Sequence, residues 1–247
     1  MNSQASALIA DRFALFSKER HAAVRLSAPR RFPDTAGLNT IPLLVGEVSE
    51  AAAHFPIVFV GTDKIQLAAA LAISSEGNLF LNPDGTWPDG VYTPALLRRR
   101  PFSIAPTDNP QRFAILLDEK DATLDGEKGA PLFDGDKTSA LGEELLALTR
   151  ELQPAAAATE AFIAAVQAQG LLASRTVTLT SGGRAPVVVQ GVQLIDPDKL
   201  AALPDSIIVE WHRNGYLAAI AYINGSQGRW QTLSRLARLR DEARVNA

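Results

Sequence analysis

The sequence contains no cysteine, and this excludes several classes of site at once. Disulfide bonds, thiolate zinc sites, iron–sulfur clusters and a cysteine nucleophile all need a residue that the chain lacks. Histidine is scarce as well, because His21, His54 and His212 are the only three, so an all-histidine metal site would need every one of them. We therefore expect a protein that holds no metal and no cofactor.

Long apolar runs are also missing. The longest, Leu67 to Ile73, is far shorter than the roughly 20 residues that span a bilayer. The N-terminal stretch has scattered apolar residues, but it lacks the basic segment and continuous apolar core of a secretory signal. These features predict a cytoplasmic protein without stable membrane insertion.

Charge of one sign is not concentrated anywhere in the chain. The formal net charge is −3 over 247 residues, and acidic and basic residues are mixed throughout. Such a chain has no overall attraction for nucleic acid or for an anionic membrane, so we expect neither as a partner. Hydrophobic residues make up 47% of the sequence, which is enough for a substantial core. Nothing in the sequence sets the oligomeric state.

The order of the expected elements indicates an α+β fold, with an antiparallel or mixed sheet of hairpins, flanking helices and a helical C-terminal segment. A short helix over 48–55 should end at Pro56, and a strand over 57–60 should follow. One hairpin is expected from strands at 67–74 and 78–82, and another from strands at 175–180 and 185–195 around the turn Ser181-Gly-Gly-Arg184. Further expectations are a short helix over 93–100, a buried strand over 112–119, helices over 139–152 and 155–170 with Gly170 as the C-cap, and helices from 196 to 245.

Several blocks of the sequence resemble one known family. "IPLLVGEVSEAAAHFPIVFV", "GNLFLNPDGTW", "YTPALLRRRPFSI", "RFAILLDE" and "PLFD" are followed much later by "GVQLID", "KLAALP" and "NGYLAAIAY". In order and spacing these blocks are similar to those of the SapC family of bacterial proteins. The resemblance covers the chain from about Leu38 to the C-terminal helix. It implies a single α+β domain over 38–247, preceded by an N-terminal extension over 1–37.

The resemblance implies a link to the bacterial surface but no reaction. The family takes its name from a locus for a paracrystalline surface layer, and its members often lie beside genes for outer-membrane receptors and flavin-dependent halogenases. It supplies no catalytic residue or cofactor. A surface-layer subunit should be exported, yet the chain has neither a signal of the usual kind nor Gly/Asp-rich calcium repeats. These observations favour an accessory protein over a building block of the layer.

Glu47, Glu50 and His54 have the spacing of one helical face. Residues three and four apart are neighbours on a helix, so two carboxylates and an imidazole could form a ligand set for iron, manganese or zinc. The alternative is a solvated face, with the acids near the helix N-terminus and the imidazole near its C-terminus, as the helix dipole favours. We favour this second interpretation, because no other segment completes a metal shell.

Two further features are candidates for binding a ligand or a partner. Arg98, Arg99 and Arg100 form the strongest local basic cluster, at the expected end of a short helix, where guanidinium groups suit phosphate or carboxylate. They could equally stabilise the helix dipole and solvate one face. Trp87 lies in a turn between two Asp-Gly pairs, either as an aromatic anchor for a partner or folded down over the core.

The sequence leaves two functional classes open. The first is a non-catalytic binding or assembly factor, whose protein partner belongs to a surface or outer-membrane system or is an operon neighbour. The second is an enzyme for an anionic substrate, with or without a metal, that uses Glu47, Glu50 and His54 with an arginine clamp. We favour the first class, because no catalytic motif is present and polar triads on helices are seldom functional.

Overall fold

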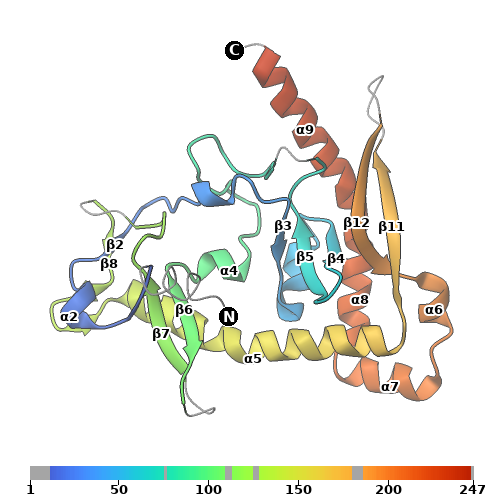
Figure 1. The fold of residues 1–247 in the computed structure, drawn as a ribbon, viewed down its shortest axis with the longest axis horizontal. Helices are drawn as coiled ribbons and strands as arrows, with labels where there is room; N and C mark the ends of the chain where they lie inside the picture. The colour runs from blue at the N-terminus through green and yellow to red at the C-terminus, as the bar shows by residue number, and fades with distance from the viewer. Residues whose placement is uncertain (1–11, 75–76, 109–112, 125–127, 180–185, 246–247) are drawn as a thin grey trace. The chain divides into compact units, whose positions relative to one another are not determined.

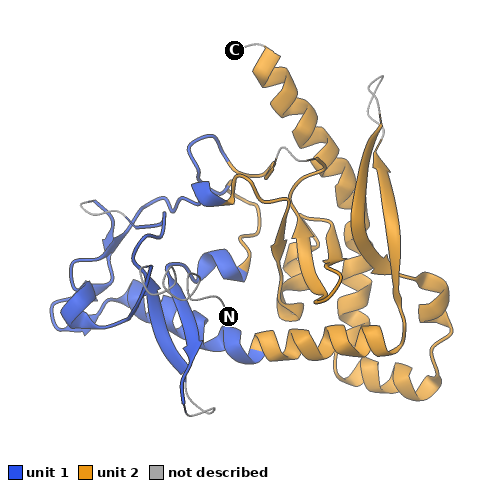
Figure 2. Cartoon of the chain, viewed as in Figure 1, with its two compact units in different colours: residues 1–34, 82–87, 95–154 blue, residues 35–81, 88–94, 155–247 orange. Residues whose placement is uncertain are grey.

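A computed structural model gives the fold of the protein and describes residues 12–74, 77–108, 113–124, 128–179 and 186–245. The fold is α+β, as the sequence predicts, with antiparallel sheets and several helices (Figure 1). The chain divides into two compact units (Figure 2). Unit 1 comprises residues 1–34, 82–87 and 95–154, and unit 2 comprises residues 35–81, 88–94 and 155–247.

Unit 1 is built on a three-stranded antiparallel sheet in the order β1-β7-β6. Its central strand β7 confirms the strand expected over 112–119, and it pairs with β1 on one side and with β6 on the other. The smaller strands pair two by two, β2 with β8 and β9 with β10. The strands are β1 (Phe13–Leu15), β2 (Arg25–Leu26), β6 (Phe102–Pro106), β7 (Phe113–Asp118), β8 (Ala130–Pro131), β9 (Phe133–Asp134) and β10 (Lys137–Thr138).

The core of unit 1 brings together residues from distant parts of the chain. Short helices α2 (Lys18–His21) and α4 (Ala95–Arg98) lie in this unit, together with the start of the long helix α5 (Ala140–Ala168). Apolar side chains of the strands and of α5 are buried together, because removing them from water is the main favourable contribution to folding. The buried cluster consists of Leu26, Phe102, Leu117, Leu132, Leu145 and Leu146.

Unit 2 is built on a five-stranded antiparallel sheet in the order β11-β12-β4-β5-β3. Two predictions are confirmed here, because β4 follows Pro56 and β11 and β12 form a hairpin. The turn expected at Ser181 to Arg184 lies outside the described residues. The strands are β3 (Thr40–Pro42), β4 (Ile57–Val60), β5 (Gln66–Ala70), β11 (Leu172–Leu179) and β12 (Val187–Ile195).

The hairpin expected from residues 67–74 and 78–82 is wrong. β5 pairs with β4 along one edge and with β3 along the other, so neither edge remains for residues 78–82. Those residues form no strand, although the N–H of Leu79 donates to the carbonyl of Leu71 at 2.9 Å. Phe80 is buried there, with its ring edge-on to Phe55 at 4.7 Å between centroids. Its packing in the core replaces the strand pairing that the sequence pattern favours.

One helix replaces the two expected over 139–152 and 155–170. α5 is a single helix of 29 residues that continues through Pro154. Gly170, at a φ of 62°, lies just beyond its end, which confirms the expected C-cap. Residues 140–154 of this helix belong to unit 1 and residues 155–168 to unit 2.

The remaining helices of unit 2 include one that is tied to the start of β4. Ser226 accepts a hydrogen bond from the N–H of Ile57 at 2.9 Å, and the side-chain amide of Gln227 donates to the carbonyl of Ile57 at 2.8 Å. These bonds join the 3-10 helix η3, which directly follows α8, to the sheet. The helices of this unit are η2 (Val45–Glu47, 3-10), α3 (Val48–Ala51), α6 (Pro197–Ala201), α7 (Asp205–Arg213), α8 (Tyr216–Gly225), η3 (Ser226–Arg229, 3-10) and α9 (Trp230–Val245).

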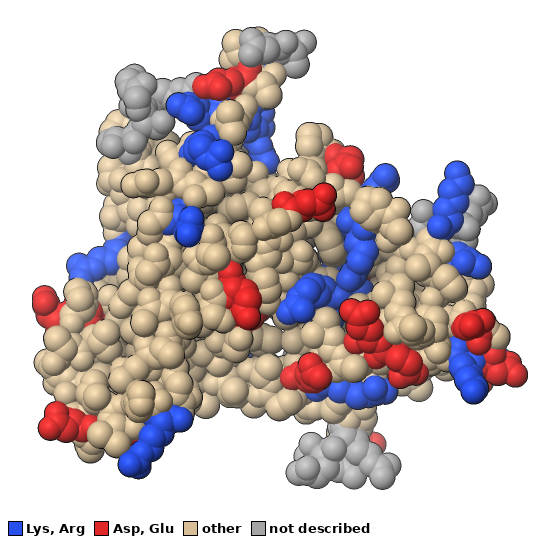
Figure 3. Space-filling view, turned by 180° about the vertical axis from the view of Figure 1, so that it is seen from behind, with Lys and Arg blue, Asp and Glu red and all other residues tan. Residues whose placement is uncertain are grey.

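The C-terminal helix α9 packs on unit 2 through its first turns. Trp230 and Leu233 are buried, and further along the helix Arg240 donates to the carbonyl of Asn78 at 2.6 Å. In the described part of the chain, no helix combines the length and the apolar character that crossing a membrane requires. Basic and acidic side chains lie close to one another on the face shown in Figure 3.

Candidate functional site

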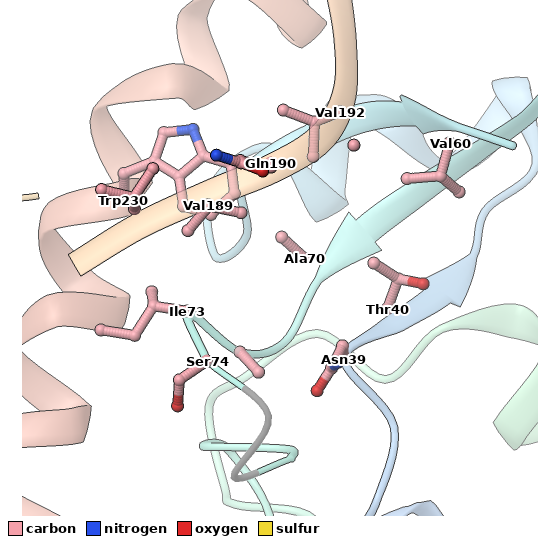
Figure 4. A pocket seen from close by; sticks show the side chains of 13 residues that line it. Asn39, Thr40, Val60, Ala70, Ile73, Ser74, Val189, Gln190, Val192 and Trp230 are labelled. Carbon is pink, nitrogen blue, oxygen red and sulfur yellow. The ribbon is translucent and has the colours of Figure 1, made fainter. Parts of the chain in front are cut away.

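One concave site in unit 2 is a cleft over one face of its sheet (Figure 4). We call it the sheet cleft, and its volume is about 250 Å³. Residues of β12 line one side, residues of β3, β4 and β5 line the other, and Trp230 at the start of α9 closes one end. The lining residues are Asn39, Thr40, Val60, Ala70, Ala72, Ile73, Ser74, Val188, Val189, Gln190, Gly191, Val192 and Trp230.

A change of direction in the β11–β12 hairpin shapes this cleft. β12 pairs with β4 only at Val192 and Gln193, so its earlier residues are not held against β4. In this stretch the register with β11 shifts between Arg175 and Val177, and Gly191 has a φ of 77°. A bulge of this kind bends a strand, and only glycine adopts such a φ without strain. The β11–β12 hairpin therefore bends away from β4 and the rest of the sheet at the point where the cleft begins.

The described lining of the sheet cleft is chemically neutral. None of its thirteen lining residues carries an ionisable side chain, and the polar side chains are Asn39, Thr40, Ser74 and Gln190. Trp230 is held in place, because its indole N–H donates to Oε1 of Gln227 at 3.0 Å. Pockets for drug-sized molecules commonly measure roughly 300–1,000 Å³. The sheet cleft is smaller than this and is lined mostly by apolar side chains among the described residues.

A second cleft of unit 2 runs along the start of α8 and has a volume of about 440 Å³. Its floor is formed by apolar residues of η2, α3, α5 and α8, and Tyr222 stands at its edge with 48% of its surface exposed. Apart from two tyrosines its lining is also without ionisable side chains. The residues are Val45, Gly46, Val48, Ser49, Ala158, Asn214, Gly215, Tyr216, Ala218, Ala219 and Tyr222.

The carboxylate of Glu47 has a structural role, because both of its oxygens accept hydrogen bonds within the protein. Glu47 is the last residue of η2 and only 5% exposed. Its Oε1 accepts the N–H of Leu44 at 2.8 Å, so the side chain reaches back to cap its own helix. Its Oε2 accepts the hydroxyl of Tyr92 at 2.8 Å. A buried polar group is costly unless it is hydrogen-bonded, and these two hydrogen bonds meet that requirement for the Glu47 side chain.

Glu50 and His54 do not extend this arrangement into a metal site. Glu50 is exposed and accepts a hydrogen bond from Ser49. α3 ends at Ala51, so His54 follows in a turn that leads to the buried Phe55 and to Pro56. Among the described residues there is no group of three or more His, Cys, Asp or Glu side chains that could hold a metal ion. Burial, followed by the positive charge of Arg229, lowers the pKa of His54 below its usual value.

The three adjacent arginines differ in their surroundings. Only Arg98 belongs to α4, and Arg99 and Arg100 follow in a turn. Arg100 is held by two carboxylates, with its Nε 2.6 Å from Asp121 and an Nη 3.0 Å from Asp34. Burial alone would lower the pKa of Arg100, but the hydrogen bonds to Asp34 and Asp121 raise it above its usual value. Arg100 thus stabilises unit 1.

Trp87 directly follows a turn that belongs to unit 1. Asp84 accepts hydrogen bonds from the backbone N–H and the hydroxyl of Thr86, and Asn82 donates to the same hydroxyl. Trp87 follows this ordered turn and is only 9% exposed. Little of its ring is therefore presented to a partner.

The SapC family model matches residues 16–233, which is most of the chain. The chain belongs to the SapC family. The match begins well before Leu38, where the most recognisable blocks start, so it includes all of β2 and starts directly after β1. No curated protein and no solved structure is significantly similar to this SapC protein.

Sequence reasoning missed the residues that organise the arginine cluster of this SapC protein. Arg30 donates to the carbonyls of Leu97 and Arg98 at 3.2 and 2.7 Å, and also to the carbonyl of Arg100. Tyr92, the partner of Glu47, is 45 residues away in sequence. No local pattern indicates either pairing, because each joins segments that only the tertiary fold brings together.

Proposed function

We propose that this SapC-family protein is a non-catalytic, cytoplasmic binding factor that serves the production of a surface-layer or outer-membrane protein. The observation that carries the proposal is the neutral lining of the sheet cleft, which suits apolar side chains and whose described residues include no acid, base or nucleophile-activating group. Family membership supports the link to a surface system. The ligand is an extended segment of the partner protein, whose apolar side chains enter the cleft.

The rim of the cleft allows a direct test in the native host. Val188 lines the cleft and is 49% exposed, while Val209 lies on α7 of the same unit and is 47% exposed. A photo-crosslinking phenylalanine analogue replaces each valine in turn, and the crosslinked products are identified by mass spectrometry. We expect a discrete product at position 188, containing a surface-layer or outer-membrane polypeptide, and no such product at position 209.

Two results would contradict the proposal. One is the same set of products at both positions, because the cleft would then confer no selectivity. The other is recovery of tagged wild-type protein mainly in the surface layer or the medium of intact cells, because an accessory factor should fractionate with the cytoplasm.

A further inference from the structure

The end of α4 in unit 1 gathers four arginines around few carboxylates. Asp34 and Asp121 bind Arg100, and Asp121 also accepts hydrogen bonds from the N–H and the hydroxyl of Thr123. Arg30 is held by backbone carbonyls on either side of Arg99, which carry only partial charge. Asp34 and Asp121 are therefore already bound to Arg100, and Glu144 is a further carboxylate whose charge acts on Arg30.

Among the described residues, no carboxylate offsets the charge of Arg99. Its Nε has no contact with solvent and no hydrogen-bond acceptor among the described residues. Burial lowers the pKa of Arg99, and no neighbouring carboxylate acts against that effect in the described part of the chain. An arginine nevertheless stays protonated at neutral pH. A partly buried cation without a counter-ion destabilises the folded protein unless something else supplies the negative charge.

Arg30 adds to the positive field at this place. Its Nε is also buried without an acceptor among the described residues, although its Nη groups are bonded to the carbonyls. Burial is the main cause that lowers the pKa of Arg30; the charge of Arg100 acts in the same direction, and the charges of Asp121 and Glu144 only partly oppose it. Two N–H donors in one cationic region are thus left without acceptors.

We infer that Arg99 is the anchor of an anion-binding site in unit 1, whose ligand presents carboxylate or phosphate oxygens. The planar guanidinium fork matches both groups, and a charge-assisted pair of hydrogen bonds would satisfy Arg99 where the chain itself does not. This inference goes beyond the proposed function, because it concerns the other unit and does not depend on what enters the sheet cleft.

The competing explanation is that Arg99 only packs its aliphatic stem against the core and serves stability. The two explanations differ in what removal of the charge does. An anion site that is empty leaves an uncompensated charge, so Arg99→Gln should leave the midpoint of thermal unfolding unchanged or raise it. A structural arginine should behave like Arg100, whose loss leaves Asp121 buried without its cation.

The experiment measures thermal unfolding midpoints of wild type, Arg99→Gln, Arg100→Gln and Arg150→Gln. Arg150 is an exposed arginine of α5 in the same unit, so its replacement controls for the change in net charge. Each protein is titrated with inorganic phosphate, and separately with a hexaglutamate peptide, against chloride at equal ionic strength. A general salt effect shifts all four proteins alike.

We expect at least one of the two anions to raise the midpoint of wild type and of Arg150→Gln in a saturable way. In Arg99→Gln the apparent affinity for that anion should fall roughly tenfold or more, as the loss of a charge-assisted hydrogen bond predicts. A response to hexaglutamate alone identifies carboxylates of a protein partner, a response to phosphate alone identifies a free phosphate-like ligand, and a response to both identifies the shared chemistry.

Arg99→Lys provides a second variant, which keeps the charge but not the fork. It should fold as wild type does and bind the anion more weakly than wild type. The inference is overturned if wild type responds to neither anion. It is equally overturned if Arg99→Gln loses stability as Arg100→Gln does, or fails to fold, while the anion response of Arg99→Lys equals that of wild type.

Discussion

The hydroxyl of Tyr92 donates a hydrogen bond of 2.8 Å to the carboxylate of Glu47, and the carboxylate in turn holds the backbone of Leu44. A glutamate that could be taken for a metal ligand thus closes a turn and joins it to a segment 45 residues away. Its chemistry is that of a buried structural acceptor, because both of its oxygens already accept hydrogen bonds.

Replacing Glu47 should therefore cost stability. Glu47→Ala leaves the N–H of Leu44 and the hydroxyl of Tyr92 without their acceptor, and we expect a loss of about 1–3 kcal/mol in the free energy of unfolding by urea. Tyr92→Phe should cost about 1 kcal/mol. The double variant should lose less than the sum, because the two changes remove the same hydrogen bond. Unchanged stability in Glu47→Ala would argue against this role.

His54 should make the stability of unit 2 depend on pH in one direction. The pKa of His54 is lowered from 6.5 in the folded state, so the unfolded chain binds the extra proton first. Stability should then fall as the pH drops from about 6.5 towards the folded-state pKa, and level off below it. His54→Gln should flatten this part of the curve of unfolding free energy against pH.

Arg229 offers a separate check on His54, because its positive charge is the second cause of the lowered pKa. Arg229→Gln should raise the pKa of His54 towards 6.5, as followed by the imidazole proton signals in NMR. A pKa that does not change would mean that burial alone accounts for the shift.

Arg100 and Arg20 should respond differently to the same substitution. The side chain of Arg100 is 13% exposed and that of its partner Asp121 is 3% exposed, so Arg100→Gln leaves a buried carboxylate without its cation. We expect a loss of about 3 kcal/mol in unfolding free energy. Arg20 and Glu119 form an ion pair at 2.6 Å, but the Arg20 side chain is 60% exposed, so Arg20→Gln should change stability little. Equal losses in urea unfolding would contradict this distinction.

Gly191 and Gly225 form a matched pair for testing the bend of the hairpin. A Cβ meets no atom within 4 Å at either position, so only the backbone angles differ. Gly191→Ala forces a φ of 77° on a residue with a side chain and should cost about 1–2 kcal/mol. Gly225 has the helical φ of −62°, so Gly225→Ala should be neutral or stabilise by up to ~1 kcal/mol. Calorimetry of the two variants checks both signs, and similar losses would count against a strained bend.

Features that depend on neighbouring residues could be predicted from the sequence. Pro56 determines where β4 can begin, Gly170 allows the αL end of α5, and the β-branched residues around Ser181 to Arg184 favour the β11–β12 hairpin. The family and the α+β class follow from blocks and patterns of the same local kind.

Features that depend on distant residues could not be predicted from the sequence. The pattern of residues 67–82 suits a hairpin, but it does not reveal that β3 and β4 occupy both edges of β5. The spacing of Glu47, Glu50 and His54 suits one helical face, but Phe55 is drawn into the core and α3 ends first. Similarly, the run of three arginines does not reveal that Arg100 binds Asp34 and Asp121 whereas Arg99 has no such partner in the described chain.

The pairing of β1 with β7 has a consequence for synthesis on the ribosome. Phe13 is paired with Asp118, which is translated 105 residues later. At about 5–20 residues per second, the first strand waits roughly 5–20 s for its neighbour, with its backbone groups and apolar side chains unpaired. Non-local pairing of this kind also slows the search for the native state. During synthesis, β1 is therefore open to mispairing and aggregation until β7 has been made.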